Sequence, residues 1–204
     1  MDRRTSTILA FILINSSIAA GTATANLLVN PGFESGSLSP WFPVPNTFSG
    51  TDFKITSAVV HSGSFSALAT GNKRLRQNFT PTPAANISEI SFWVRHPTGG
   101  PNQQTAIDFF YSDGTGNQPV LDVQTTGWEF FNVTNLLNTN KSLSGFAIWG
   151  YTDFTTTPPS TYVDDVTIET IPEPAAPALF TVGVGLVGAM RHRRPDRSAP
   201  RRDR

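Results

Sequence analysis

The chain has 204 residues, of which 15% are charged, and its 15 Lys and Arg side chains balance its 15 Asp and Glu side chains. This balance hides an asymmetry, because nine arginines lie in the two ends, whereas the body over 26–171 holds eleven acidic and six basic residues. A body with a net charge near −5 lacks the basic surface that nucleic acid requires. The absence of cysteine excludes disulfides and thiol catalysis.

The first 25 residues have the three-part order of a secretory signal peptide. Two arginines precede an apolar run over 8–14, and Ala23 and Ala25 form an A-x-A cleavage site. The apolar run is too short to span a bilayer stably. We therefore expect signal peptidase to remove 1–25, and the alternative is a buried N-terminal helix.

The end of the chain carries a second three-part pattern. Its parts are Pro172, Glu173 and Pro174, then a glycine-rich apolar segment over 175–190, then the basic residues Arg191, Arg193 and Arg194. The apolar segment is marginal as a permanent membrane span, for which roughly 20 residues are usual. Arginines that follow such a segment favour the cytoplasmic side of the membrane. Together with the N-terminal signal, this pattern predicts that the body lies outside the inner membrane.

The second pattern resembles the PEP-CTERM sorting signal, which exosortases handle in Gram-negative bacteria. The resemblance covers 172–194 and departs from the family in a longer basic tail over 195–204. It implies a transient inner-membrane intermediate held through 175–190 and cleavage by an exosortase-like protease. Display at the cell surface or in an extracellular matrix of exopolysaccharide would follow. An ordinary C-terminal membrane anchor is the alternative, and it predicts the same side of the membrane.

Period-two alternation of apolar side chains recurs along the body, separated by turn residues such as those at 112–114. The expected inward-facing residues are Ile90, Phe92 and Val94, then Ile107, Phe109 and Tyr111, then Phe146 and Ile148, and finally Val166 and Ile168. This alternation is typical of half-buried strands, and no window has the period of an amphipathic helix. The body is therefore predicted to be one all-β domain over 26–171, a two-sheet antiparallel sandwich.

Four motifs follow one another along this domain. They are Asn26–Gly36 with the nearby Trp41, His61–Ser66, Gly127–Glu129, and Tyr162–Val166. The series resembles the carbohydrate-binding-module jelly rolls of the galactose-binding-like group. The resemblance implies a jelly-roll sandwich whose first and last strands lie close together. It does not imply sugar binding, because one fold hosts many functions.

The same resemblance implies a structural calcium ion. Glu34 and Asp164 match the carboxylate positions, and backbone oxygens around 61–63 would complete the oxygen-rich shell that calcium prefers. We expect Asp165 to contribute less, because alternation along a strand sends neighbouring side chains to opposite faces. The alternative is that Glu34 and Asp164 accept backbone N–H bonds in turns and hold no metal.

Alternation also predicts which side chains point away from the core. The outward set that could contact a glycan is Trp93, Arg95, Asp108, Phe110, Trp149 and Tyr151. Aromatic rings stack on the apolar faces of pyranoses, and charged planar groups bind the hydroxyls. We expect these residues to form one glycan-binding platform, and the alternative is that the aromatic rings serve packing.

A catalytic role has little support in the sequence. The only histidines of the body are His61 and His96, and neither has the spacing of a metal site or a catalytic triad. The expected function is that of an exported, non-catalytic protein that contacts extracellular polysaccharide. A purely structural matrix or adhesion protein is the first alternative, and a polysaccharide hydrolase or lyase is a more distant one.

Overall fold

The structure, a computed structural model, describes residues 25–46, 48, 50–97, 103–151 and 160–171. The predicted signal peptide at 1–25 lies almost wholly outside the described residues, and the predicted sorting signal and basic tail over 172–204 lie wholly outside them. Within the described part of the chain, no helix is both long enough and apolar enough to cross a membrane.

The described residues form strands joined by turns and by two single-turn 3-10 helices, at Ala84–Asn86 and Thr134–Leu136. The strands are β1 (Phe42–Val44), β2 (Gly50–Thr56), β3 (Ser66–Gly71), β4 (Arg74–Pro83), β5 (Ile87–Arg95), β6 (Gln103–Tyr111), β7 (Gly116–Asn117), β8 (Val120–Val123), β9 (Trp128–Asn132), β10 (Ser142–Tyr151) and β11 (Ser160–Thr170).

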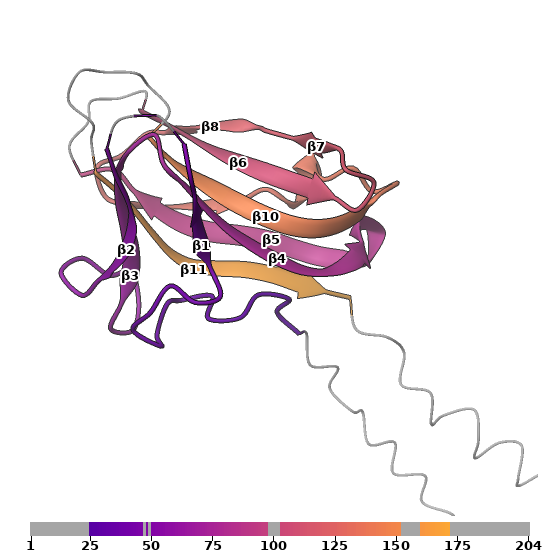
Figure 1. Cartoon of the computed structure of the whole chain (residues 1–204), viewed down its shortest axis with the longest axis horizontal. Coiled ribbons are helices and arrows are strands. Elements are labelled where there is room, and N and C mark those ends of the chain that lie inside the picture. Colours follow the sequence, from indigo (N-terminus) through magenta and orange to yellow (C-terminus); the bar gives the residue numbers. More distant parts are fainter. Residues whose placement is uncertain (1–24, 47, 49, 98–102, 152–159, 172–204) are drawn as a thin grey trace, which may run out of the picture. The chain divides into compact units, whose positions relative to one another are not determined.

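These strands make two antiparallel sheets that face each other (Figure 1). One sheet has five strands in the order β2-β3-β11-β5-β9. The other has six, in the order β1-β4-β10-β6-β7, with β8 also pairing with β6. Every described pairing between strands is antiparallel, and most neighbours in a sheet are distant in the sequence. The predicted all-β, jelly-roll-like sandwich is therefore confirmed.

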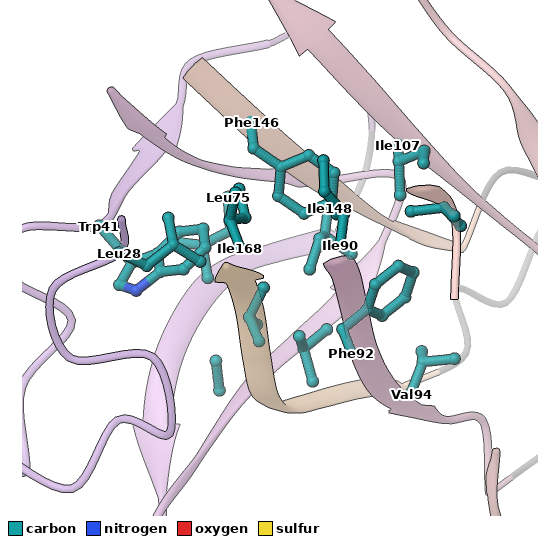
Figure 2. Close-up of a cluster of buried hydrophobic side chains, with 14 of the residues drawn as sticks. Leu28, Trp41, Leu75, Ile90, Phe92, Val94, Ile107, Phe146, Ile148 and Ile168 are labelled. Atoms are coloured by element: carbon teal, nitrogen blue, oxygen red, sulfur yellow. The ribbon is translucent and has the colours of Figure 1, made fainter. Parts of the chain in front are cut away.

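The core lies between the sheets and is built from the inward side of the alternating strands (Figure 2). All ten side chains that alternation assigned to the interior are buried, none more than 5% exposed. Phe92 of β5 and Phe146 of β10 meet across the two sheets with ring centroids 6.3 Å apart. Removing such aromatic and branched side chains from water supplies the main stabilisation of a domain that has no disulfide.

The N-terminal segment of the domain runs beside its last strand. Asn26 bridges Glu169, the backbone N–H of Leu27 donates to the carbonyl of Ile168 at 2.8 Å, and that of Val166 donates to Pro31 at 3.0 Å. The segment of the first motif thus lies beside the last strand, although it forms a single bridge and turns where a first strand was expected. Because these contacts join the two ends of the domain, they bring the turn after Asn30 close to the irregular part of β11 between Asp164 and Thr167.

Candidate functional site

The six residues expected to share one platform lie on two different sheets. Trp93 and Arg95 belong to β5 of the five-stranded sheet, whereas Asp108, Phe110 and Trp149 belong to β6 and β10 of the six-stranded sheet. Their strand neighbours on both sheets pack into the core, so the two groups point outward on opposite sides of the sandwich. The prediction of a single platform was wrong, because alternation fixes the face of a strand but not the sheet that the strand joins.

Tyr151, the sixth of these residues, is the last residue of β10. The pairing of β10 with β6 shifts register between Ile148 and Tyr151, so the simple alternation that linked Tyr151 to Trp149 is interrupted there. The side chain of Tyr151 lies outside the described part of the structure.

On the five-stranded sheet, the aromatic side chains hold a loop. The His61 ring stacks on Trp93 with centroids 3.9 Å apart and an interplanar angle of 18°, and Trp128 meets His61 edge-on at 5.6 Å. The indole N–H of Trp128 donates to the carbonyl of Val60 at 3.1 Å. One face of Trp93 is therefore covered by protein, and this cluster anchors the loop before β3 to the sheet.

On the six-stranded sheet, the outward side chains form a network around one carboxylate. Oδ2 of Asp108 accepts hydrogen bonds from the indole of Trp149 at 2.8 Å and from Nη1 of Arg74 at 3.0 Å. The Arg74 guanidinium also lies 4.8 Å from the centroid of the Trp149 ring. Asp108 is 9% exposed at its side chain, so its ion pair is largely removed from water and holds both partners in place.

Strand register explains why these side chains meet. Trp149 pairs with Arg74 across β10 and β4, while Ala147 lies between Arg76 on one side and Asp108 on the other. The middle strand, β10, thus presents the small Ala147 between the polar side chains of Arg76 on β4 and Asp108 on β6. The long side chains of β4 and β6 can therefore reach across β10 toward each other.

Gly145 is a second position on β10 that carries no long side chain. It lies between Asn78 of β4 and Phe110 of β6. A Cβ at Gly145 would lie 2.8 Å from Oδ1 of Asn78 and 3.6 Å from Nε of Arg76. Glycine at this position therefore leaves the room that the hydrogen bond from Arg76 Nε to Asn78, 2.6 Å long, occupies.

A shallow pocket of ≈ 200 Å³ opens beside this network. Its lining residues are Arg74, Asp108, Phe109, Phe110, Gly116, Asn117 and Gln118. The volume is below the roughly 300–1,000 Å³ of pockets that enclose drug-sized ligands. The pocket presents the Gln118 amide, the Asp108 carboxylate and the Arg74 guanidinium beside the Phe110 ring. Its size suits a single polar ring, such as one unit of a polymer that lies along the open surface.

Sequence reasoning missed four residues of this surface, namely Arg74, Arg76, Asn117 and Gln118. A signal for the arginines was present, because Arg74-Leu75-Arg76 alternates like a strand and places two of the six basic residues of the body on one face. Asn117 and Gln118 gave no such signal. Their place on the pocket wall depends on the pairing of β7 with β6, in which Asn117 lies opposite Phe109.

A second polar cluster joins the N-terminal loop to the loop before β3. The Glu34 carboxylate accepts the backbone N–H of Ser64 at 2.9 Å and that of Phe65 at 3.1 Å. Asp164, fully buried, accepts the backbone N–H of His61 at 2.9 Å. These bonds are those of the capping alternative, in which the carboxylates satisfy the turn amides.

Asp165 lies on the same side as Asp164, contrary to the expectation from alternation. β11 has a register shift between Asp164 and Thr167, and Asp165 has a positive φ of 46°. This bulge turns both carboxylates toward the same loop, so that Oδ2 of Asp165 lies 2.7 Å from Nδ1 of His61. The expectation that the two aspartates face apart was wrong.

The cluster brings two carboxylates to the same side of one loop. Burial, with a smaller contribution from the neighbouring Asp165 charge, raises the pKa of Asp164 to about 6. A Cβ at Gly32 would lie 3.2 Å from Oδ1 of Asp165 and 3.9 Å from Oδ1 of Asp164, so this glycine keeps a small space beside two carboxylates. Among the described residues, no group of three or more His, Cys, Asp or Glu side chains is arranged around a metal position. Backbone oxygens would have to supply the remaining ligands.

Comparison with known proteins places the fold. No protein-family model matches this chain, and no curated protein matches it. The CBM22-1 xylan-binding domain of Paenibacillus barcinonensis Xyn10C matches with a TM-score of 0.54 and 16% identity, over 76% of this chain and 100% of that domain. The enzymatically active domain of bacteriophage CBA120 tailspike protein 4 matches with a TM-score of 0.52 and 12% identity, over 72% of this chain but only 21% of that one. A CBM61 structure in complex with β-1,4-galactotriose matches at 24% identity and a TM-score of 0.49, over 72% of this chain and 99% of that one.

All of these identities are below 25%, so the similarity concerns the fold alone. Of these three structures, the two with TM-scores above 0.5 are a binding domain, which is covered completely, and a much longer tailspike domain, of which 21% is covered. The described residues form a β-sandwich whose fold is similar to that of the CBM22-1 domain.

Proposed function

We propose that this domain is a non-catalytic module that binds extracellular glycan on the outer face of its six-stranded sheet. The observation that carries the proposal is the network in which Asp108 holds Arg74 and Trp149 beside the pocket that Asn117 and Gln118 line. Groups fixed in advance lose little conformational entropy when a ligand binds. The fold shared with a xylan-binding domain supports the same conclusion.

The opposite face is the weaker choice for glycan contact. There the Trp93 ring is covered on one side by His61, and Arg95 donates to the backbone of Thr126 at 3.1 Å. Both side chains are therefore engaged in holding loops. Phe130, 47% exposed, is the outward aromatic residue of that face with the largest exposed fraction among those described.

A glycan array with the full-length chain in mild detergent tests the proposal. We expect binding to one class of polysaccharide, weakened at least tenfold by Trp149→Ala and unchanged by Trp93→Ala. Trp149→Phe keeps an aromatic ring but loses the N–H that donates to Asp108. It therefore distinguishes a contribution from ring stacking on the sugar from a contribution of the hydrogen bond to Asp108. Loss of binding with Trp93→Ala but not with Trp149→Ala would move the site to the five-stranded sheet.

The two rival functions predict different outcomes when the protein is exposed to polysaccharides. A structural matrix protein without a sugar site would bind no glycan while remaining folded, as judged by near-UV circular dichroism. A hydrolase would release reducing ends and lose that activity on replacement of a carboxylate. Asp108 is the only carboxylate among the described residues that line the pocket, whereas most glycosidases use two, so the geometry favours binding over hydrolysis.

We further propose that the protein is exported and then sorted to the cell surface or the polysaccharide matrix. The support is the sequence order at the two ends, with Ala23 and Ala25 before the domain and Pro172-Glu173-Pro174 after it. Mass spectrometry of the protein from envelope and medium fractions tests both cleavages. The expected product starts near Asn26 and ends near the Pro-Glu-Pro motif, and a product that retains 175–190 would indicate an ordinary anchor.

For the cluster around Glu34 and Asp164 we propose a structural calcium ion. Calcium would neutralise the buried Asp164 carboxylate and, through Glu34, tie the N-terminal loop to β11, which suits a chain without disulfides. The hydrogen bonds from the backbone N–H groups of Ser64 and His61 already let the same carboxylates order these loops without a metal. The role of such an ion would be stability and not sugar chemistry.

A further inference from the structure

The outer face of the six-stranded sheet carries two arginines side by side. Arg74 and Arg76 alternate on β4 and so point to the same side of the sheet. Arg76 lies 3.6 Å from the centroid of the Phe110 ring, and Arg74 lies 4.8 Å from that of Trp149. A guanidinium thus lies over each of these two rings.

This stacking changes what a ligand would meet. The rings were expected to offer bare faces to a sugar, but the guanidinium of Arg76 covers Phe110 at van der Waals distance. Stacked arginines are fixed in orientation by the ring beneath them and keep their N–H donors at the rim free to point outward. The approach to Phe110 is therefore through the donors of Arg76.

The two arginines differ in their charge partners. Arg74 is paired with Asp108 at 3.0 Å. Arg76 donates from Nε to the neutral Asn78 side chain, and no ion pair of Arg76 with a carboxylate occurs among the described residues. Burial and the adjacent Arg74 charge lower the pKa of Arg76 from its ordinary value. Arg74 and Arg76 thus share one neighbouring carboxylate, Asp108, which leaves an excess positive charge in a domain whose net charge is negative.

We propose that the glycan bound on this face is acidic, with the carboxylate of a uronic acid unit held by Arg76. This inference rests on the proposed glycan-binding function and specifies its ligand class. A guanidinium binds a carboxylate through two parallel N–H···O bonds, and such charge-assisted bonds are roughly twice as strong as neutral ones. Gln118, on the pocket wall, supplies an amide for a hydroxyl of the same or the next sugar. The side chain of Asn117 is already engaged, because its Oδ1 accepts from the Tyr111 hydroxyl and its Nδ2 donates to the carbonyl of Leu136. Asp108, already engaged by Arg74 and Trp149, is kept from repelling the ligand by its ion pair.

Two ligands that differ only in charge test this proposal. Polygalacturonate and its fully methyl-esterified form share a backbone, but the ester lacks the carboxylates. Binding of the full-length chain in mild detergent is measured by isothermal titration calorimetry at low and at moderate salt. We expect polygalacturonate to bind at least tenfold more tightly than the ester, with a difference that shrinks as salt rises because exposed charges are screened.

Two substitutions localise the effect. Arg76→Gln removes the charge but keeps a polar side chain able to bond Asn78, and it should erase most of the preference for polygalacturonate over the ester. Lys54→Gln is the matched control, because Lys54 is exposed on β2 of the other sheet and its loss changes the net charge equally. Lys54→Gln should leave both affinities within twofold.

Three results would overturn the inference or its foundation in different ways. Equal binding of polygalacturonate and ester, both weakened by Trp149→Ala, would refute the acidic ligand class and leave the glycan site standing. Tighter binding of dextran sulfate than of polygalacturonate, dependent on Arg76, would replace the uronate with a sulfate ester. No binding of any of these polymers or of neutral β-1,4-galactan and xylan by the folded protein would refute the proposed function itself.

Discussion

The Asp108 carboxylate accepts the indole N–H of Trp149 at 2.8 Å, across two neighbouring strands whose residues are 41 positions apart. The same oxygen is 3.0 Å from Nη1 of Arg74 on the next strand. One oxygen atom therefore connects the three central strands of the six-stranded sheet, β4, β10 and β6. This arrangement makes Asp108 a structural element of the face that we propose as the glycan site.

Replacing Asp108 should destabilise the domain through this network. Asp108→Ala leaves the partly buried Arg74 charge and the Trp149 N–H without their acceptor, and we expect the free energy of unfolding to fall by about 1–3 kcal/mol. Asp108→Asn keeps one acceptor oxygen and should cost less. Urea denaturation monitored by tryptophan fluorescence measures both.

The control for this series is Asp122→Ala. Asp122 is exposed on β8 and accepts a hydrogen bond from Gln104 at 3.0 Å, so its loss should change the free energy of unfolding by no more than about 0.5 kcal/mol. Equal effects of Asp108→Ala and Asp122→Ala would show that the network contributes nothing to stability.

A glycine comparison tests the contact between Glu34 and the loop before β3. Gly63 has a φ of +65°, and a Cβ there would lie 2.4 Å from the Glu34 carboxyl carbon. Gly114 also has a positive φ, +81°, but a Cβ there would meet nothing within 4 Å. Gly114→Ala should therefore show only the backbone strain, roughly 1–2 kcal/mol. Gly63→Ala should cost more, because it also displaces Glu34 from the amides of Ser64 and Phe65. Similar losses in thermal denaturation would contradict a role for that contact.

The pH dependence of stability should depend on His96, which is fully buried at the end of β5. Burial lowers the pKa of His96 from 6.5 to about 4, although the side chain of Gln103 opposes this shift. The unfolded chain then binds a proton more readily than the folded one between these values. The contribution of His96 to stability is therefore full above about pH 6.5 and declines as the pH falls toward 4, by up to roughly 3 kcal/mol.

His96→Gln should remove this dependence, whatever its effect on stability at neutral pH. Asp164 acts in the opposite direction, because its raised pKa gives a contribution that is present below 3.8 and lost as the pH rises through about 6. The quantity to compare is the free energy of unfolding of the unsubstituted protein and of His96→Gln, measured by urea denaturation at each pH from 4 to 7. A constant difference would mean that His96 titrates alike in the folded and unfolded chains.

Calcium should raise the thermal midpoint of the protein, and chelation should lower it. At a calcium concentration 100 times the dissociation constant, a single site adds about 2.7 kcal/mol to the free energy of unfolding, which is a shift of several degrees for a domain of this size. Glu34→Gln should abolish the response. The control is Asp113→Asn, which removes an exposed carboxylate paired with Lys141 on a distant turn. If calcium does not shift the thermal midpoint of the unsubstituted protein, the carboxylates serve only to accept hydrogen bonds from backbone N–H groups.

Local sequence pattern was sufficient for the fold class. The alternation at Ile90, Phe92 and Val94 on β5, and at Phe146 and Ile148 on β10, correctly gave both strands and their buried sides. This succeeds because the direction of each side chain along a strand is set by the backbone of that strand. The pattern failed where the backbone is irregular, as at Asp165, whose positive φ belongs to a bulge in β11.

The all-β class of the body, its lack of disulfides and the buried side of each regular strand could all be predicted from the order of residues. Two properties became visible only in the folded protein: Trp93 and Trp149 lie on opposite sheets, and Arg74 and Arg76 lie over Trp149 and Phe110. The first kind of property depends on residues next to one another in the chain. The second depends on which strands pair, and that choice is made by hydrogen bonds and packing between segments tens of residues apart, which no local pattern encodes.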